Sequence, residues 1–417
     1  MLVYVINKNG NPLMPCKPAK ARKLLRDKKA KVIKRTPFTI KLLWDCEENT
    51  QDLTLGVDSG SKTIGTAVRD DDNQVYYLSE VELRQNIKSK LDTRRMYRRN
   101  RRSRKTRYRK ARWINRANSI KKDRYAPTIV SKYNSIIKEL WFVCKLLPIK
   151  NLIIETGTFD PHALHNPAVI KHPWLYQKGL KFGYYNTKQF ILSRDNYLCQ
   201  YCKGKSKDPK LQVHHIVPRN QGGSDRPDNL LTLCKTHHDA WHDGLITLNK
   251  KHTKNVKLGL NHATHMNVLQ SLFRKTLDYI ETYGYITKMI REYFDIPKMH
   301  CYDAACVEIT NPKMLTLLTD RILLKRCINQ GRYQQTWGIR SEKRYPKKKV
   351  FGFKTWDRVL YQNTICFVKG TMSTGYYILC DIFGKKINFK PMAKAKTLKR
   401  LSARKSWIIT EEVIPST

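Results

Sequence analysis

Two short hooks of metal-binding side chains place the tightest constraint on how this chain folds. Cys199-x-x-Cys202 is the first hook, and Cys234-x-x-His237 is the second. Two intervening residues let both side chains of a hook reach one tetrahedral ion, and Zn²⁺ accepts sulfur and imidazole nitrogen alike. We therefore predict a structural zinc site that joins the two ends of a module too small for a good core. The alternative is a set of reduced thiols that lie near each other by accident.

The stretch between the hooks is rich in histidine. Val213 to His238, "VHHIVPRNQGGSDRPDNLLTLCKTHH", holds four of the chain's twelve histidines. The segment "LQVHHIVP" predicts a short strand, and "DNLLTLCKTHHDAWHDG" predicts a helix with Asn229 near its start. On that helix His238 and His242 are four apart and share a face. Together with His214 they can hold one metal ion, while His215 is left free to take a proton from water, since a neutral imidazole titrates near pH 6.5.

The charge of the chain indicates its partner. Eighty-one lysines and arginines stand against 34 acids, a formal charge of +47. Such an excess destabilises a compact fold unless a polyanion cancels it, so we expect nucleic acid, with a basic membrane-surface protein as the alternative. No apolar run reaches the roughly 18 residues of a membrane span, and the N-terminus lacks the features of a signal peptide. Eleven cysteines, an odd number, indicate reduced thiols and a cytoplasmic location.

The basic residues concentrate in one run. From Arg94 to Arg112 twelve of nineteen residues are Lys or Arg, and no acid occurs between Asp92 and Asp123. The run has no Gly or Pro and is rich in arginine, a good helix former, so we predict a helix roughly 28 Å long that binds phosphates. Tyr97, Tyr108 and Trp113 among the arginines are able to stack on bases or sugars. The alternative is a disordered basic arm. The expected nucleic-acid contacts are Arg94, Arg95, Arg98, Arg99, Arg101, Arg102, Arg104, Arg107, Arg109 and Arg112.

Three acids far apart in the chain follow apolar strands or begin a helix. Asp58 ends the strand-like "LTLGVDSGSKTIG", and Glu155 ends "NLIIETGTFD". His300 and Asp303 lie three apart in "MHCYDAACV", on one face of an expected helix start. Helical spacing also covers 128–147 and 268–284, residues 1–48 form a small separate module, and the last ninety residues alternate as strands do.

The histidine-rich stretch closely resembles the HNH, or ββα-metal, nuclease motif. The resemblance implies that His215 is the general base and that His214 and His238 approach the catalytic metal. It also makes His242 a third ligand and gives Asn229 the role of bracing the loop. Many members have Cys-x-x-Cys as the second zinc hook, and Cys234-x-x-His237 departs from that pattern.

The three acids resemble the split motifs of a RuvC-type, RNase H-like nuclease. The resemblance implies that Asp58, Glu155 and Asp303 hold two divalent ions, Mg²⁺ or Mn²⁺, with His300 beside them in the catalytic site. The family usually has Asn two residues beyond the glutamate, where this chain has Gly157. An arginine-rich helix after the first motif and an HNH module between the second and third resemble IscB, the transposon-encoded relative of the type II CRISPR effector nucleases. The "NPLMP" at Asn11 to Pro15 and "STGYY" in the tail match its terminal modules.

The resemblance to IscB implies an α/β multidomain fold with a RuvC core, split by the bridge helix and the inserted HNH domain, and a β-rich C-terminal domain. The expected boundaries are 1–50 (the Pro-Leu-Met-Pro module), 51–83, 123–165 and 256–330 (RuvC), 84–122 (bridge helix), 166–255 (HNH) and 331–417 (target-adjacent-motif domain). The expected activity is RNA-guided cutting of double-stranded DNA, HNH on the guide-paired strand and RuvC on the displaced one. A long structured guide RNA would make the chain a monomeric ribonucleoprotein in a prokaryotic cytoplasm. The alternatives are an unguided HNH homing or restriction-type endonuclease, and a catalytically silent RNA-binding regulator.

Overall fold

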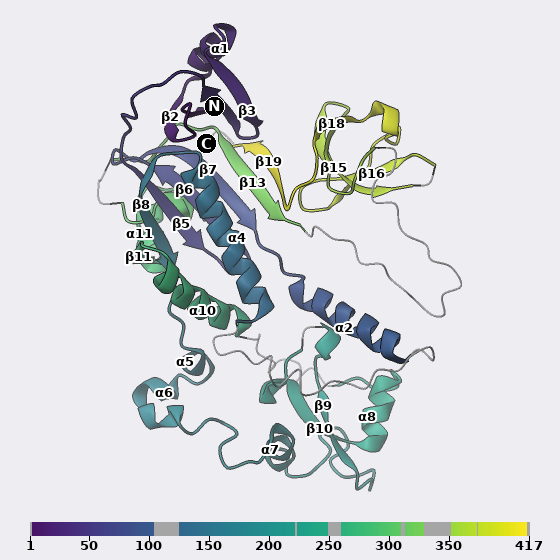
Figure 1. The fold of residues 1–417 in the computed structure, drawn as a ribbon. Helices are drawn as coiled ribbons and strands as arrows, with labels where there is room; N and C mark the ends of the chain where they lie inside the picture. The colour runs from purple at the N-terminus through teal and green to yellow at the C-terminus, as the bar shows by residue number, and fades with distance from the viewer. Residues whose placement is uncertain are drawn as a thin grey trace. The chain divides into compact units, whose positions relative to one another are not determined.

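The computed structural model describes residues 2–103, 125–221, 223–248, 260–309, 313–328, 352–372 and 374–414. The chain divides into two compact units (Figure 1). Unit 1 consists of residues 1–157 and 266–417, and unit 2 consists of residues 158–265. The expected mixed α/β multidomain architecture is confirmed. In the described ranges, no helix has the length and apolar character that crossing a membrane requires.

An eight-stranded mixed sheet forms the centre of unit 1, with the order β11-β8-β5-β6-β7-β13-β19 and a short strand, β12, beside β7. β5, β6 and β7 form an antiparallel meander. β8 runs parallel to β5, and β11 runs parallel to β8. The strands are β5 (Leu53–Ser59), β6 (Thr63–Arg69), β7 (Gln74–Glu82), β8 (Ile149–Thr156), β11 (Ile280–Tyr283), β12 (Thr316–Leu317), β13 (Arg321–Cys327) and β19 (Trp407–Val413).

Helices cover both faces of this sheet, and its strands are therefore buried on both sides. α4 (Pro127–Cys144) begins at a proline in its first turn and buries Ile136, Leu140 and Val143 at helical spacing. These residues join one core with Val57, Tyr77 and residues of α10 (Asn261–Thr276). α12 (His300–Ala305) packs on the opposite face, in a second core. Figure 1 shows α4 lying along the sheet.

A buried ion pair fastens α4 to the sheet. Lys325 Nζ of β13 lies 2.6 Å from Glu139 Oε1 of α4, and both side chains are fully buried. Tyr77 donates a hydrogen bond of 2.9 Å to the same oxygen. Burial lowers the pKa of Lys325 to about 8. Removing one partner would leave an uncompensated buried charge, at a cost of about 3–5 kcal/mol.

Two smaller sheets complete unit 1. The N-terminal sheet has the order β2-β1-β4-β3, with α1 (Pro18–Arg26) packed against it. The C-terminal sheet has the order β17-β16-β15-β14-β18. The N-terminal strands are β1 (Val3–Ile6), β2 (Pro12–Cys16), β3 (Ala30–Arg35) and β4 (Phe38–Leu42). The C-terminal strands are β14 (Arg358–Tyr361), β15 (Thr364–Thr371), β16 (Tyr377–Cys380), β17 (Lys386–Ile387) and β18 (Lys399–Ser402).

Unit 2 is built on a two-stranded antiparallel sheet of β9 (Leu211–His215) and β10 (Leu230–Cys234). Helix α8 (Lys235–His242) follows β10 directly. α7 (Thr187–Arg194) begins at Asn186, whose side chain caps it by accepting from the Gln189 amide. Two short helices, α5 (Pro161–His165) and α6 (Ala168–Lys171), stand earlier in the unit.

Three sequence-based expectations about these elements were wrong in part. The helix expected over 228–244 begins only at Lys235, because Leu230–Cys234 is completely buried and pairs with β9. The helix expected over 268–284 ends at Thr276, and β11 follows in register with β8. The last strand, β19, pairs with β13 of the central sheet instead of joining the C-terminal sheet. In the first two cases strand pairing decides the conformation, and in the third it decides which sheet the strand joins; local periodicity shows neither.

Candidate functional site

Three histidines of unit 2 converge as the spacing predicted. His214 stands at the end of β9, while His238 and His242 share one face of α8. The three can each offer a ligand nitrogen, and these atoms all lie within 4.8 Å of one another. The ring centroids of His238 and His242 are 4.6 Å apart. Neutral imidazole is a common ligand of divalent metals, so this set suits a metal ion.

His214 is buried among aromatic rings of α8. Its side chain is buried against Trp241, with ring centroids 4.2 Å apart, and its Nε2 has no hydrogen-bond partner among the described residues. Burial, and then the nearby His238 and His242, lower the pKa of His214 to about 4. A neutral imidazole with an unpaired buried nitrogen fits a metal ligand.

His215, next along the strand, is held by an acid. Its Nε2 donates to Asp225 Oδ1 at 2.7 Å, and Arg219 contacts the same carboxylate oxygen at 2.7 Å. The hydrogen bond from His215, followed by that from Arg219, lowers the pKa of Asp225. A cavity of about 550 Å³ is lined by His215 together with His214, His238 and His242. The geometry thus leaves His215 beside the three metal-binding candidates, with its orientation fixed by Asp225.

Asn229 braces the loop that follows β9. It is fully buried, its Oδ1 accepts from the Val217 amide at 2.8 Å, and its Nδ2 donates to the Val217 and Ser224 carbonyls. Gly223 lies against the same place, where a Cβ would stand 1.7 Å from the Val217 oxygen. These contacts agree with the bracing position that the resemblance implied for Asn229. Asn229 is the last residue of a short 3-10 turn (Pro227–Asn229) directly before β10, and it does not lie near the start of an α-helix as expected.

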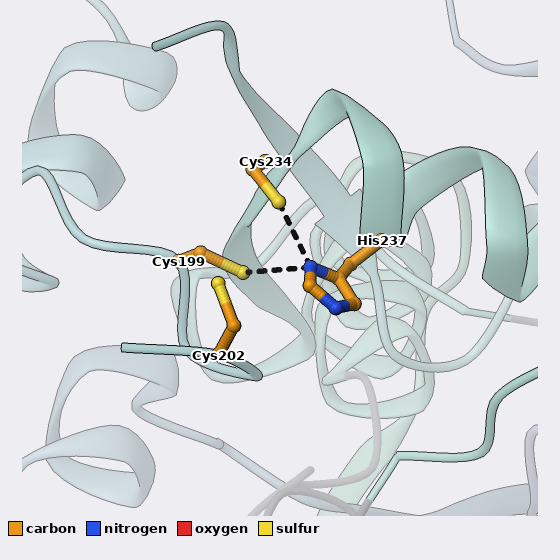
Figure 2. Close-up of side chains that lie close together, drawn as sticks. All are labelled: Cys199, Cys202, Cys234 and His237. Carbon is orange, nitrogen blue, oxygen red and sulfur yellow. Dashed lines mark hydrogen bonds between the residues drawn. The ribbon is translucent and has the colours of Figure 1, made fainter. Parts of the chain in front are cut away.

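The two hooks meet in a single cluster (Figure 2). The ligand atoms of Cys199, Cys202, Cys234 and His237 all lie within 4.8 Å of one another. His237 Nδ1 is 2.9 Å from Cys234 Sγ and 4.0 Å from Cys199 Sγ. Tetrahedral zinc with Zn–S near 2.3 Å places ligand atoms roughly 3.5–4 Å apart, so the four fit one zinc ion closely.

Hydrogen bonds at the first hook favour the thiolate form of Cys202. Burial raises the pKa of Cys202, but hydrogen bonds from the Ser206 hydroxyl and from nearby backbone amides outweigh it and lower this pKa to about 6. Ser206 Oγ lies 3.3 Å from Cys202 Sγ and 3.2 Å from Cys234 Sγ. Because thiolate is the form that binds metal, the site is arranged for a cation.

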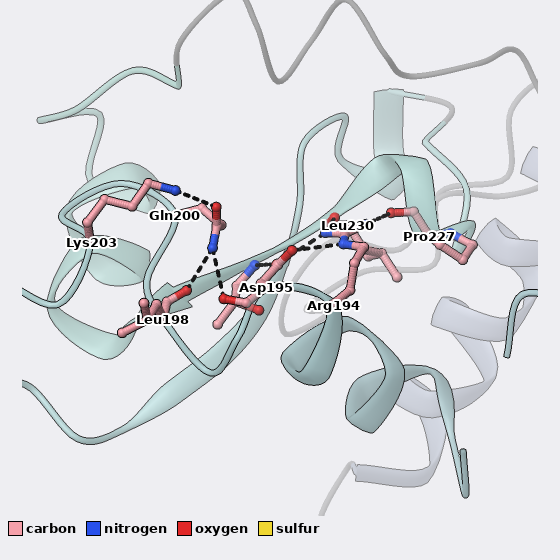
Figure 3. Close-up of polar contacts among 8 residues, drawn as sticks. Arg194, Asp195, Leu198, Gln200, Lys203, Pro227 and Leu230 are labelled. Atoms are coloured by element: carbon pink, nitrogen blue, oxygen red, sulfur yellow. Dashed lines mark hydrogen bonds and ion pairs between the residues drawn. The ribbon is translucent and has the colours of Figure 1, made fainter. Parts of the chain in front are cut away.

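A polar network supports the sheet that carries these residues (Figure 3). Asp195 Oδ2 accepts from the Thr232 amide of β10 at 2.8 Å. Arg194 pairs with Asp195 and donates to the Pro227 and Leu230 carbonyls. Gln200 donates to the Asp195 and Leu198 carbonyls, which fixes the turn that holds the first hook. No sequence signal indicates this network, because its members are ordinary acids and amides without motif spacing.

Replacing Cys199 and Cys202 by Ser is expected to unfold the region around 195–245 and to abolish metal binding there. The energy of a structural zinc site, about 10–16 kcal/mol in small zinc-binding peptides, is folding energy for a module of this size. Elemental analysis and limited proteolysis measure the effect, with the exposed Cys144→Ser as control. Folded, active protein without zinc would contradict the assignment.

Stability of unit 2 is expected to depend on pH through His214. Its folded pKa, about 4, lies below the unfolded value near 6.5, so the unfolded state binds the extra proton. This contribution is fully present above about pH 6.5 and is lost as the pH falls toward 4. Unfolding of unit 2 in urea, followed by limited proteolysis at several pH values, measures it. In His214→Gln this part of the pH dependence should vanish, and an unchanged profile would show that His214 does not cause it.

The three distant acids and His300 also come together, in unit 1. Asp58 of β5 pairs in register with Glu155 of β8, and His300 Nδ1 donates to Asp58 Oδ2 at 2.5 Å. Asp303 follows His300 by one helical turn on α12. Among the described residues, these acids are not a set whose ligand atoms all lie within 4.8 Å of one another. A pair of ions roughly 3.5–4 Å apart needs carboxylates that are spread more widely than a single ion does.

The pKa values of Glu155, Asp303 and His300 are raised in this cluster. Burial, and then the charge of Asp58, raise the pKa of Glu155 to about 7, and its Oε2 has no hydrogen-bond partner in the described part of the chain. Burial, followed by Asp58, also raises the pKa of Asp303. The hydrogen bond with Asp58 raises the pKa of His300. A buried acid with an unpaired oxygen beside two others suits divalent cations.

Arg291 is a site residue that the sequence did not indicate. Its Nε lies 2.9 Å from Asp303 Oδ1, a close ion pair whose angle is not that of a hydrogen bond, and its Nη1 donates to the Ile296 carbonyl. Arg291 belongs to α11 (Gly284–Tyr293), which follows β11. At the start of α11, a Cβ on Gly284 would stand 2.6 Å from Glu155 Oε1. No motif spacing could have linked these residues to the acids.

Glycines bring the helix that carries Asp303 down onto the sheet. A Cβ on Gly56 of β5 would lie 2.1 Å from the Ala304 oxygen, and one on Gly65 of β6 would lie 1.8 Å from the His300 oxygen. Both contacts are with backbone atoms, which have little freedom to move. The absence of a side chain at these two strand positions therefore sets the height of α12 above Asp58.

Gly65→Ala is expected to displace α12 and to disable the acid cluster while the histidine site remains intact. The backbone of His300 must move by more than an ångström, and overpacking of this kind costs about 1–3 kcal/mol or more. The measurement is divalent-ion binding to each site by calorimetry. The control is Gly370→Ala, whose Cβ would meet nothing closer than 3.8 Å. Equal effects of both substitutions would contradict the packing argument.

The arginine run is helical as far as the structure describes it. α2 (Ile87–Ser103) includes Arg94, Arg95, Arg98 and Arg99, whose side chains are exposed. The first turn of this helix has no acidic residue. Tyr97 lies on the same helix. Arg101 and Arg102 belong to it by backbone. Arg104, Arg107, Arg109, Arg112, Tyr108 and Trp113 lie outside the described residues.

Two family matches cover consecutive parts of the chain. Residues 3–179 match the RRXRR protein family, and residues 199–244 match the HNH endonuclease family. The second match spans both hooks and all three converging histidines. The chain contains an HNH endonuclease domain. With the RRXRR region ahead of that domain, the resemblance to IscB is confirmed, and the chain is IscB-like in its domain content.

Individual proteins match over shorter stretches. The type IV methyl-directed restriction enzyme EcoKMcrA of Escherichia coli (strain K12) is 36% identical over 63 residues, 13% of this chain and 22% of the enzyme. Anaredoxin of Nostoc sp. is 29% identical over 58 residues, 14% of this chain and 74% of anaredoxin. Streptococcus thermophilus Cas9, solved in complex with the GGAA PAM, is 14% identical with a TM-score of 0.33. That comparison covers 51% of this chain and 30% of Cas9, so the chain spans under a third of both EcoKMcrA and Cas9.

Proposed function

We propose that this IscB-like protein is an RNA-guided DNA endonuclease that cuts each strand of a duplex at a separate site. The observation that carries the proposal is the presence of two complete constellations in one chain, the histidine cavity of unit 2 and the acid cluster of unit 1. Neither set shares a residue with the other. The domain boundaries expected from the sequence and a prokaryotic cytoplasmic location belong to the same proposal.

In the HNH domain, His214, His238 and His242 would hold a divalent ion such as Mg²⁺ or Mn²⁺. When bound, that ion stabilises the charge that develops on the scissile phosphate and its leaving oxygen. His215 takes the proton from the attacking water, and Asp225 holds its ring in place through the 2.7 Å hydrogen bond. Asn229 holds the two ends of the loop beyond β9 together through its hydrogen bonds to Val217 and Ser224. Cys199, Cys202, Cys234 and His237 would hold zinc at the two hooks, where it would stabilise the fold and take no part in the chemistry.

The sheet of unit 1 supports a RuvC assignment. The order β7-β6-β5-β8-β11 is an antiparallel meander continued by two parallel strands, which is the RNase H-like arrangement that the motifs resembled. Asp58, Glu155 and Asp303 would hold two divalent ions, which clamp the attacking and leaving oxygens of a phosphodiester. His300, placed by its hydrogen bond to Asp58, is able to move a proton at this site.

A guide RNA is inferred from the charge of the chain and from the short segment between α2 and α4. A formal charge of +47 and the arginines of α2 fit a bound polyanion, held through its backbone instead of its sequence. Only about twenty residues separate α2 from α4, too few for a large protein lobe that would cradle a heteroduplex. A structured guide RNA would supply that scaffold, and base pairing would choose the target.

RNA that copurifies with the protein tests the proposal. We expect one dominant RNA of defined length, with duplex cutting that stops after RNase treatment and returns when that RNA is added back. An unguided HNH endonuclease would cut equally well without RNA. A silent RNA-binding regulator would retain the RNA and leave DNA uncut at every divalent-ion concentration.

A further inference from the structure

A cavity of about 640 Å³ lies within unit 1 and shares no lining residue with either constellation. Three parts of the chain line it: residues 33–36 of the N-terminal module, α4 at Lys138 and Phe142, and the C-terminal residues Trp356, Arg358, Phe367 and 401–409. We call it the junction site. Its volume falls in the range of ligand pockets, roughly 300–1,000 Å³, which leaves room for part of a single strand but not for a duplex.

The lining of the junction site is one-sided in charge. Six of its described residues are cationic and none of them is acidic: Lys34, Arg35, Lys138, Arg358, Arg404 and Lys405 are the cations. A concave surface that collects one sign of charge concentrates its field and attracts the opposite charge. The expected ligand is therefore an anion with several charges.

The cations crowd one another in the free protein. Burial, and then the charge of Lys405, lower the pKa of Lys34. Burial also lowers the pKa of Lys138. Cys327 and Glu139 act to raise that pKa, and Lys405 acts to lower it. Lys405 thus stands within electrostatic range of the partly buried Lys34 and of the exposed Lys138. Repulsion of this kind is tolerated by a folded protein when a bound anion relieves it.

The remaining donors and rings fit the parts of a nucleotide. Arg358 is mostly buried, donates from Nη1 to Thr36 Oγ1 at 2.7 Å, and has an Nε without a hydrogen-bond partner among the residues that the structure describes. Hydroxyls of Ser402 and Ser406 add neutral donors to the lining. The rings of Trp356 and Phe142 also line the cavity, and aromatic faces beside cations are what single strands bind.

We propose that the junction site binds the phosphodiester backbone of a single nucleic-acid strand, and that this strand is the guide RNA. The proposal rests on the proposed function, because a resident RNA is what would keep these cations neutralised throughout the protein's life. The bound strand would bridge the N-terminal module, α4 and the C-terminal sheet. In this way RNA binding would fix the position of the C-terminal module against the central sheet.

Lys405→Gln tests the site through two effects of opposite sign. Removing this exposed charge should raise the melting temperature of the nucleic-acid-free protein, since it relieves Lys34 and Lys138. The same change should weaken binding of a synthetic 20-nucleotide single-stranded RNA by several-fold. Its salt dependence should become shallower by about 0.7 in log–log slope for each phosphate that the variant no longer neutralises. If Lys405 had a purely structural role, its replacement would instead lower the melting temperature.

Lys396→Gln is the matched control, an exposed lysine of the same C-terminal module outside the cavity. It sets the background effect of losing one positive charge. A DNA oligonucleotide of the same sequence forms the second arm: weakening of RNA and DNA alike supports phosphate recognition, and weakening of RNA alone supports a site that also reads the ribose. Identical behaviour of Lys405→Gln and Lys396→Gln with both strands would overturn the proposal. Because the strands are synthetic, that outcome is distinct from a failure to find copurifying guide RNA.

Discussion

Replacing His215 by Ala should reduce the rate of cutting of the guide-paired strand by about 10²–10⁴-fold, the usual contribution of a positioned general base. The displaced strand should still be nicked at its normal rate. His214, His238 and His242 do not depend on His215 for their positions, since β9 and α8 hold them. Metal binding and folding of unit 2 should therefore persist in the variant.

A duplex labelled differently at the two 5′ ends, cleaved by the protein with its RNA, gives both rates in one experiment. His172→Ala, an exposed histidine of the same unit, is the control and should leave both rates unchanged. Asp225→Asn should give a smaller loss on the same strand, because it removes only the group that orients the base. Loss of both cuts in His215→Ala, with RNA and target still bound, would refute separate sites.

Asp58→Ala should have the converse effect and remove cutting of the displaced strand. Asp58 lies beside Glu155 and is the acceptor for His300, so its loss removes a cation ligand and releases the histidine. It should also lower the pKa of Glu155, since Asp58 is the largest charge that raises it. The guide-paired strand should be cut as before.

The matched control for this change is Asp52→Ala, an exposed acid just before the same strand that pairs with Lys150. Divalent-ion titration of both variants separates lost ion binding from lost folding. Wild-type cutting of the displaced strand by Asp58→Ala would show that the acid cluster is not a nuclease site.

The sequence was most informative where spacing alone brings ligands together. The Cys-x-x-Cys and Cys-x-x-His hooks and the i,i+4 pair His238 and His242 are local patterns, and the structure places them as those patterns predict. The helix containing His238 was nonetheless placed too early, since the strand Leu230–Cys234 is defined by its partner β9. Asp225 could have been proposed only as one acid among several in a polar loop.

The acid cluster shows more clearly which features the sequence could not predict. Strand-end positions predicted Asp58 and Glu155, and their register as neighbours depends on the parallel pairing of β5 with β8. Arg291 and the contact between Gly65 and His300 could not be predicted. The first depends on how α11 packs against α12, and the second on how α12 packs on a strand more than 200 residues earlier in the sequence. The junction site likewise joins three segments that no local pattern connects.

Exchange of the guide segment tests the central claim most directly. The protein is assembled with its copurifying RNA and with a version in which only the segment complementary to the target is replaced. We predict that both cuts move to the DNA sequence that matches the new segment, and that the former target becomes resistant. Cuts that stay at the former sequence with either RNA, or that continue without RNA, would contradict a guided nuclease.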